Sequence, residues 1–225
     1  MHSSSVAIPL AIVGLIDDRY NLSASIRFLV QSTTAILIVS FSPLVRGLLS
    51  SDRYHIFCLV FVFFLIISIT AVINFVNFMD GLDGLVSGCM LISITTLSIS
   101  LSAPSPLWAL LGSLSCFFFW NWSPAKVFMG DIGSTFLGAV FAGLVLHAYS
   151  WTEAFSHLLV AAPLLFDAFF CVLRRLYHGH YIFSAHRLHL FQRLHQAGWS
   201  HSRVALTYIS ATAVLALSIL FGGTN

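Results

Sequence analysis

The chain of 225 residues has little charge and no paired cysteines. Lys, Arg, Asp and Glu make up 8% of it, whereas soluble globular domains usually carry about 25%. The four cysteines lie inside apolar runs without CxxC spacing, so we expect them to be small buried hydrophobic side chains. A net charge of +2 is too small to indicate a nucleic-acid partner. These deficits exclude a soluble domain and predict an integral protein of the lipid bilayer.

Apolar segments fill most of the chain, which is 58% hydrophobic. A helix needs about 20 apolar residues to cross a bilayer, and unpaired strand edges cannot face lipid. We therefore predict an all-α, polytopic transmembrane helical bundle that forms one domain over 1–225. About seven full spans are expected, at 27–45, 55–76, 84–102, 106–121, 135–150, 154–173 and 203–222.

A shorter apolar piece, 6–16, opens the chain. Its residues reach only about 16 Å as a helix, too short to cross alone. It also lacks the basic start and the small-residue cleavage site of a signal peptide. We expect a partial helix whose beginning is missing.

Charged residues segregate to one side of the predicted bundle. If successive spans alternate in direction, eight of the ten Lys and Arg residues lie in loops on one face, which the positive-inside rule assigns to the cytoplasm. The same face receives five acids: Asp17, Asp18, Asp80, Asp83 and Asp131. Six of the ten histidines also fall there. The simplest account is one cytoplasmic polar site built from four separate loops.

The sequence NFVNFMDGLDG carries the clearest site signal. Asn74, Asn77, Asp80 and Asp83 recur every third residue at the end of an apolar segment. Acids at the mouth of a bilayer are costly and indicate function, and positions three apart are neighbours on a helix. Glycines beside them let the backbone approach a ligand closely, and hard cations prefer oxygen ligands. We predict a site for a divalent cation here.

Two further loops place acids on the same face. Asp17 and Asp18 are adjacent, so one is expected to face a metal or substrate and the other a basic partner, unless both belong to a solvated helix cap. In NWSPAKVFMGDIGST, Asp131 stands between glycines and Ser134 begins a predicted helix, whose free N–H groups favour phosphate. Lys126 adds a cation nearby. A plain capped turn is the alternative.

The segment 174–203 is basic and rich in histidine. Apolar residues at helical spacing predict a helix lying on the membrane surface: Leu188, Phe191, Leu194 and Ala197. Its Arg and His side chains suit a pyrophosphate or anionic lipids, although a basic juxtamembrane helix explains them equally well. Asp167, inside the preceding span, either lines a cavity and contacts a sugar or turns toward Arg174 or Arg175.

Four motifs, in this order, resemble those of one family: GLIDDRY, NFVNFMDGLDGL, FMGDIGST and AHRLHLFQRL. They are similar to motifs of the polyprenyl-phosphate N-acetylhexosamine-1-phosphate transferases, and the O-antigen type is the nearest branch. The resemblance implies an enzyme of the bacterial inner membrane with its active site facing the cytoplasm. It would transfer a sugar-1-phosphate from a UDP-amino-sugar to undecaprenyl phosphate, release UMP and start lipid-linked glycan synthesis.

The resemblance also implies roles for individual residues, with Mg²⁺ or alternatively Mn²⁺ as cofactor. Asn77 and Asp131 would be the metal ligands, and Asp17 would act on the lipid phosphate as base or nucleophile. Asp18, Asp80 and Asp83 would hold nucleotide or metal, and His189 would contact phosphate or sugar. The expected substrate-binding residues are Asn74, Lys126, Ser134, Arg187 and Arg193.

The chain departs from the family pattern in two ways. The histidine loop commonly reads His-x-His-His, but Leu190, Phe191 and Gln192 follow His189 here, so only His189 matches. Family members also carry helices before the Asp-Asp motif, so we expect the first helices to be lacking. An inactive truncated member and a non-enzymatic transporter stay open as alternatives, although no inverted repeat is visible. A homodimer also stays open.

Overall fold

A computed structural model of the chain describes residues 8–20, 22–50, 55–179 and 189–222, without the side chains of Ile8, Asp18 and His55. Across these ranges the protein is entirely helical, with no strand, which confirms the predicted all-α membrane bundle. The helices are α2 (Ile8–Tyr20), α3 (Ala24–Phe41), α4 (Pro43–Leu49), α5 (His55–Phe78), α6 (Leu85–Ser100), α7 (Ser105–Asn121), α8 (Gly130–Val145), α9 (Trp151–Val160), α10 (Ala162–Tyr177), α11 (Leu190–Gln196) and α12 (His201–Gly222).

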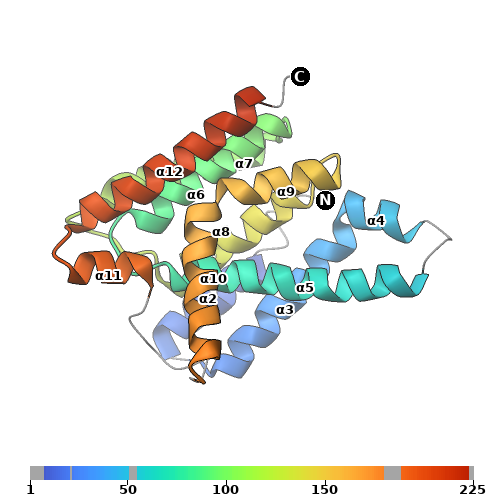
Figure 1. Cartoon of the computed structure of the whole chain (residues 1–225), viewed down its shortest axis with the longest axis horizontal. Coiled ribbons are helices and arrows are strands. Elements are labelled where there is room, and N and C mark those ends of the chain that lie inside the picture. Colours follow the sequence, from blue (N-terminus) through green and yellow to red (C-terminus); the bar gives the residue numbers. More distant parts are fainter. Residues whose placement is uncertain (1–7, 21, 51–54, 180–188, 223–225) are drawn as a thin grey trace.

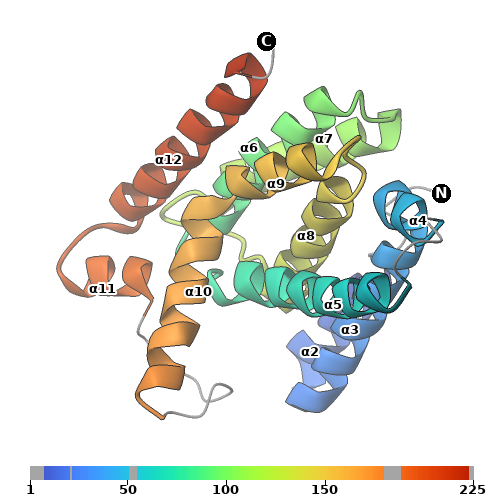
Figure 2. The same ribbon diagram turned by 45° about the vertical axis from the view of Figure 1, so that its right-hand side comes forward.

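Helix α8 lies at the centre of the bundle (Figures 1 and 2). Nearly all of its side chains after the first turn are buried, and α2, α5 and α6 pack against it. Helix α12 runs along α6, and α11 lies between α10 and α12. The core therefore forms around α8, and the N-terminal ends of α8 and α6 and the C-terminal ends of α2 and α5 bring the acidic motifs toward one end of the bundle.

The predicted span 27–45 is interrupted at Ser42. Its hydroxyl accepts a hydrogen bond from the Val45 N–H at 3.3 Å and donates one to the Leu146 carbonyl at 2.9 Å. Pro43 has no N–H and favours the first turn of a new helix. The first long helix therefore ends at Phe41, and the short α4 follows it.

The predicted span 154–173 is also two helices, so the expectation of one continuous span is wrong here. Helices α9 and α10 meet at Ala161 with a bend of 83°. Pro163, in the first turn of α10, cannot donate the hydrogen bond that would continue α9. The bend directs α10 toward α11 (Figure 2).

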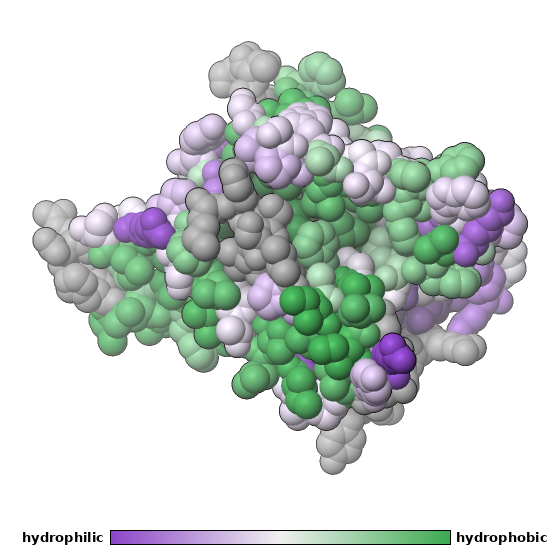
Figure 3. All heavy atoms as spheres, turned by 180° about the vertical axis from the view of Figure 1, so that it is seen from behind, coloured by the Kyte–Doolittle hydropathy of each residue, from purple (hydrophilic) through white to green (hydrophobic). Residues whose placement is uncertain are grey.

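Among the described residues, α3, α5 and α12 are long and apolar enough to cross a membrane, and the bent pair α9–α10 would make a fourth span. Helices α6 and α8 are apolar but have 16 residues each, about 24 Å at 1.5 Å per residue. Large apolar side chains such as Phe57, Phe63 and Phe64 are exposed along α5. Apolar side chains also cover much of the face in Figure 3. The outside of the bundle thus suits lipid.

Candidate active site

Asp17 and Asp131 share one cation, the guanidinium of Arg27. Its Nη1 lies 3.1 Å from Asp17 Oδ2 and 2.9 Å from Asp131 Oδ2. Asp17 lies in the last turn of α2, Arg27 in the first turn of α3 and Asp131 in the first turn of α8. Asp17 Oδ1 also accepts a hydrogen bond from the Leu22 N–H at 2.7 Å. Three chain segments therefore bring two carboxylates and one arginine together.

The two carboxylates repel each other when both are charged. Asp131 precedes the predicted span 135–150. Partial burial raises the pKa of its carboxyl group, the neighbouring Asp17 raises it further, and Arg27 opposes this rise. A cation between the carboxylates relieves the repulsion. The pair is consequently suited to a positive ligand.

Close packing of α2 on α8 fixes the distance between these acids. Gly14 lies one turn before Asp17, and a Cβ atom built on it would overlap the backbone of Ile132. Only glycine allows this approach. Beside it, Gln31 accepts a hydrogen bond from the Asn74 amide at 2.7 Å. Asn74 thus supports the wall of the crevice that Asp17, Arg27 and Gln31 line.

Asn77 joins the same cluster from α5. Its Oδ1 accepts a hydrogen bond from the Ser134 hydroxyl, which also bonds to the Gly130 carbonyl one turn back in α8. Ser134 is fully buried. The hydrogen bond places the amide oxygen of Asn77 against the first turn of α8, where Asp131 lies.

Asp83 faces a different set of partners. Its Oδ2 lies 3.1 Å from His201 Nδ1 at the start of α12 and accepts a hydrogen bond from the Ala125 N–H at 3.3 Å. The buried Asn121 fixes the neighbouring turn, since its Oδ1 accepts hydrogen bonds from the Gly84 N–H and the Ser87 hydroxyl. Gly84 has a φ of 75°, which favours glycine. The loop after α5 is therefore held on both sides.

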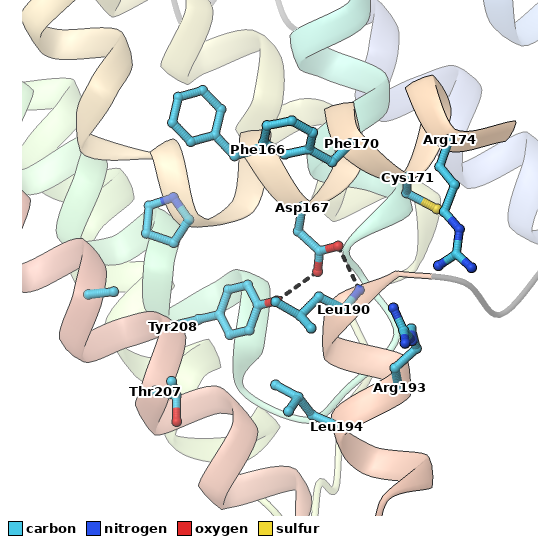
Figure 4. Close-up of a pocket in the computed structure, with 12 residues that line it drawn as sticks. Phe166, Asp167, Phe170, Cys171, Arg174, Leu190, Arg193, Leu194, Thr207 and Tyr208 are labelled. Atoms are coloured by element: carbon cyan, nitrogen blue, oxygen red, sulfur yellow. Dashed lines mark hydrogen bonds between the residues drawn. The ribbon is translucent and has the colours of Figure 1, made fainter. Parts of the chain in front are cut away.

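Asp167 is buried in the middle of α10, and its carboxylate contacts α11 and α12 (Figure 4). Oδ1 accepts a hydrogen bond from the Leu190 N–H at 2.7 Å, and Oδ2 accepts from the Tyr208 hydroxyl at 2.7 Å. His189 Nδ1 lies 3.8 Å from Oδ1. The first expectation for Asp167 is confirmed in part, because its side chain lines a cavity, and its hydrogen-bond donors are α11 and Tyr208 rather than Arg174 or Arg175.

Helix α11 turns one apolar side chain of the predicted surface helix into the protein. Phe191 is fully buried, and its ring would be 3.2 Å from a Cβ built on Gly81. The Phe191 N–H donates to Asp167 at 3.1 Å. Leu188 lies outside the described residues. Phe191 therefore anchors α11 between α10 and α12, while Leu190 and Arg193 stay exposed.

A cavity of about 400 Å³ lies between α10, α11 and α12 (Figure 4). Its walls are mainly apolar, with Phe166, Phe170 and Leu194 among them, and two arginines line it as well, Arg174 and Arg193. Asp167 closes one side through its bond to Tyr208. The cavity therefore combines an apolar surface with positive charge.

The structure gathers some of the predicted site residues and not others. Asp17, Asp131, Asn77 and Ser134 form one group, whereas Asp83 contacts His201 and His189 lies beside Asp167. The ammonium of Lys126 lies 4.9 Å from the centre of the Trp120 ring, and Lys126 is exposed. Asp80 is partly buried in the loop. The side chain of Asp18 and the whole of Arg187 lie outside the described residues.

Sequence reasoning missed Arg27, Gln31 and Tyr208. Arg27 was counted only as a positive charge of a loop, although it lies in the first turn of an apolar helix close to the Asp-Asp motif. Gln31, one turn after Arg27, is likewise a polar residue within an apolar helix. Nothing in the sequence marks Tyr208 as the partner of Asp167.

A divalent cation fits the donors of the first group. In the part of the chain that the structure describes, no three His, Cys, Asp or Glu side chains gather as a metal site. The donors here are two carboxylates and the amide oxygen of Asn77, which are the oxygen ligands that Mg²⁺ accepts together with water or phosphate. Arg27 already places a positive charge between the two carboxylates.

Comparison with known proteins defines the class of this chain. A family described as glycosyl transferase family 4 matches residues 2–149. The chain belongs to this family, and it is a multi-pass membrane protein. Its match covers the Asp-Asp motif, the NFVNFMDGLDG motif and Asp131, so the first group of site residues lies inside the matched region.

Individual relatives include the "Probable undecaprenyl-phosphate N-acetylglucosaminyl 1-phosphate transferase" of Bacillus subtilis, 31% identical over 96% of this chain and 67% of the relative. The decaprenyl-phosphate N-acetylglucosaminephosphotransferase of Mycobacterium leprae is 33% identical over 50% of this chain and 33% of the relative. The phospho-N-acetylmuramoyl-pentapeptide-transferase of Carboxydothermus hydrogenoformans is 33% identical over 51% of this chain and 34% of the relative. The chain thus spans two thirds of one relative and about a third of the others.

Proposed function

We propose that the chain transfers an N-acetylhexosamine-1-phosphate, or a related amino-sugar-1-phosphate, from a UDP-sugar to undecaprenyl phosphate. An oxygen of the lipid phosphate attacks the phosphorus that carries the sugar, and the bond from this phosphorus to UMP breaks. The products are undecaprenyl-diphospho-sugar and UMP. The excess of Lys and Arg in the loops that hold the site supports a cytoplasmic orientation in the bacterial inner membrane.

The convergence of Asp17 and Asp131 on Arg27 carries this proposal. The two acids are 114 positions apart in the sequence (131 minus 17) and come from different helices, yet they contact the same guanidinium nitrogen. Phosphoryl transfer depends mainly on positioning and on neutralising phosphate charge. A cluster of acids with its own cation at the end of a membrane bundle is suited to that task.

Asp131 and Asn77 would hold Mg²⁺ or Mn²⁺, with Asp17 beside them. When bound, the ion would neutralise the diphosphate of the UDP-sugar. Ser134 orients the Asn77 amide through its hydrogen bond. Arg27 keeps the carboxylates together and balances their charge. A phosphate monoester is already largely ionised at neutral pH because its second pKa is about 6, so Asp17 acts more through alignment than as a base.

The cavity between α10, α11 and α12 supports an amphiphilic acceptor. Its apolar walls fit a polyprenyl chain, and Arg174 and Arg193 fit an anionic headgroup. His189 lies at the start of α11, next to Asp167 and on the same short helix as Arg193. We place the lipid phosphate on this side and the nucleotide near the loop that holds Asp83.

The test is UMP release by the full chain in membranes supplied with undecaprenyl phosphate, Mg²⁺ and either UDP-N-acetylglucosamine or UDP-N-acetylgalactosamine. Asp131→Ala should abolish UMP release while the protein stays in the membrane. Glu153→Gln is a matched control, because Glu153 bonds to Tyr149 and Ser100 at the other end of the bundle. It should keep wild-type turnover.

Three results would contradict the proposal. Wild-type turnover in Asp131→Ala would remove the assigned metal ligand. Uptake of the UDP-sugar into vesicles without UMP release would identify a transporter. The absence of UMP release with both UDP-sugars would reject this transferase reaction.

A further inference from the structure

Asp167 holds three segments of the protein together at one buried point. It is 9% exposed and lies ten residues before the end of α10. It accepts hydrogen bonds from two backbone N–H groups of α11 and from the hydroxyl of Tyr208 in α12. The imidazole of His189 is also near this carboxylate, with Nδ1 3.8 Å from Oδ1.

A buried carboxylate is a costly means of joining helices. An acid placed within a membrane bundle usually serves function, because apolar packing would join the same helices without desolvating a charge. Here each oxygen is satisfied by donors that are not themselves charged. The carboxylate therefore serves to fix the position of the first turn of α11 rather than to stabilise the protein in general.

That first turn carries His189, and two neighbours fix its backbone. The His189 N–H donates to Gln192 Oε1 at 3.4 Å, and Phe191 packs on Gly81. Gln192 and Phe191 are the residues that depart from the family's histidine pattern. In this chain they bind the backbone of His189 and anchor α11 to the loop that contains Asp80 and Asp83.

We propose that Asp167, completed by Tyr208, is the positioning residue for His189. It sets the place of the imidazole relative to the acidic loop, and it acts on the reaction only through that ring. The inference rests on the proposed transferase function for its kinetic effect. The geometry on which it rests, Asp167 between Tyr208 and the His189 turn, does not depend on that function.

The kinetic test is a double-mutant cycle with the purified full chain. Tyr208→Phe removes one donor to Asp167 and should lower kcat about tenfold, since hydrogen bonds to charged groups are among the strong ones. Asp167→Asn should lower kcat further, because its amide cannot accept all three hydrogen bonds. In a His189→Ala background both substitutions should change the remaining turnover by less than about twofold, because they act through the missing ring.

A purely structural role gives a different pattern. Each substitution would then cost the same factor with or without His189, and this result would overturn the proposal. Unchanged kcat in both Tyr208→Phe and Asp167→Asn would overturn it as well. Tyr149→Phe is the matched control, because Tyr149 is 77% exposed at the other end of the bundle, and it should keep wild-type kcat.

A second measurement needs no activity. His189 is 3% exposed, so its modification by diethyl pyrocarbonate, followed peptide by peptide with mass spectrometry, should be slow in the wild type. Tyr208→Phe and Asp167→Asn should accelerate it about tenfold or more, by the same loss of hydrogen bonds. An unchanged rate would reject the positioning role even in a chain that releases no UMP, whereas missing UMP release with an accelerated rate would reject only the proposed function.

Discussion

Replacement of Arg27 by methionine tests whether the paired carboxylates take up a metal ion. The side chain of Met is similar in length and carries no charge, so Arg27→Met leaves Asp17 and Asp131 facing each other. We expect a less stable protein in the presence of a chelator. We also expect Mg²⁺ to restore more stability to this variant than to the wild type, because the ion no longer competes with the guanidinium.

The size of the effect follows from the exposure of the groups. The Arg27 side chain is 40% exposed, whereas the Asp17 side chain is 6% exposed. Loss of one partner of a buried ion pair costs about 3–5 kcal/mol, but solvent screening reduces exposed pairs to about 1 kcal/mol or less. We therefore expect a loss of about 1–2 kcal/mol, which lowers the Tm by about 2–8 °C for a domain of this size.

The assay is thermal unfolding of the full chain in detergent, with and without Mg²⁺. Arg46→Met is the matched control, because Arg46 lies over the Phe41 ring and bonds to the Ser40 carbonyl, far from the acids in sequence and in contacts. Its Tm should not depend on Mg²⁺ more than that of the wild type. The double variant Arg27→Met with Asp131→Asn should regain stability in chelator. An equal loss in Arg27→Met with and without Mg²⁺ would refute the reasoning.

Three further predictions concern the supports of the site. Gly14→Ala should destabilise the protein by about 1–3 kcal/mol in thermal unfolding, because the added methyl group overpacks against Ile132. Gly112→Ala is the control and should not destabilise it, because a Cβ there meets nothing within 4 Å. Asn121→Ala leaves the Gly84 N–H without its acceptor and should cost about 1–3 kcal/mol in chemical unfolding, and an unchanged midpoint would contradict this. Chelation of divalent ions should stop UMP release, and added Mg²⁺ or Mn²⁺ should restore it. Turnover that persists in the chelator would exclude a metal requirement.

The sequence was sufficient to predict the helical membrane fold, because so few charged residues leave no other stable arrangement in lipid. It failed where a local contact interrupts an apolar run. Pro43 and Pro163 were visible signals, yet hydropathy alone extended the predicted spans across them. The 83° bend after α9 depends on how α10 packs against α11, α12 and α5, and this information is not local.

Part of the site could likewise be predicted from the sequence, and part could not. The motifs predicted that Asp17, Asn77 and Asp131 would gather, because polar groups in a membrane bundle avoid the surface that faces lipid. They did not predict Arg27 as the shared partner, since an arginine in a loop contributes equally to topology wherever it points. The partners of Asp167 were equally hidden, because two of its three donors are backbone N–H groups that every residue except proline carries.

The attachment of α11 has a consequence for how the chain can vary. Asp167 holds the backbone of Leu190 and Phe191, and Gly81 accommodates the Phe191 ring. A larger residue at position 81 would bring its Cβ to 3.2 Å from that ring, so variation there is expected to displace the start of α11 and the imidazole with it.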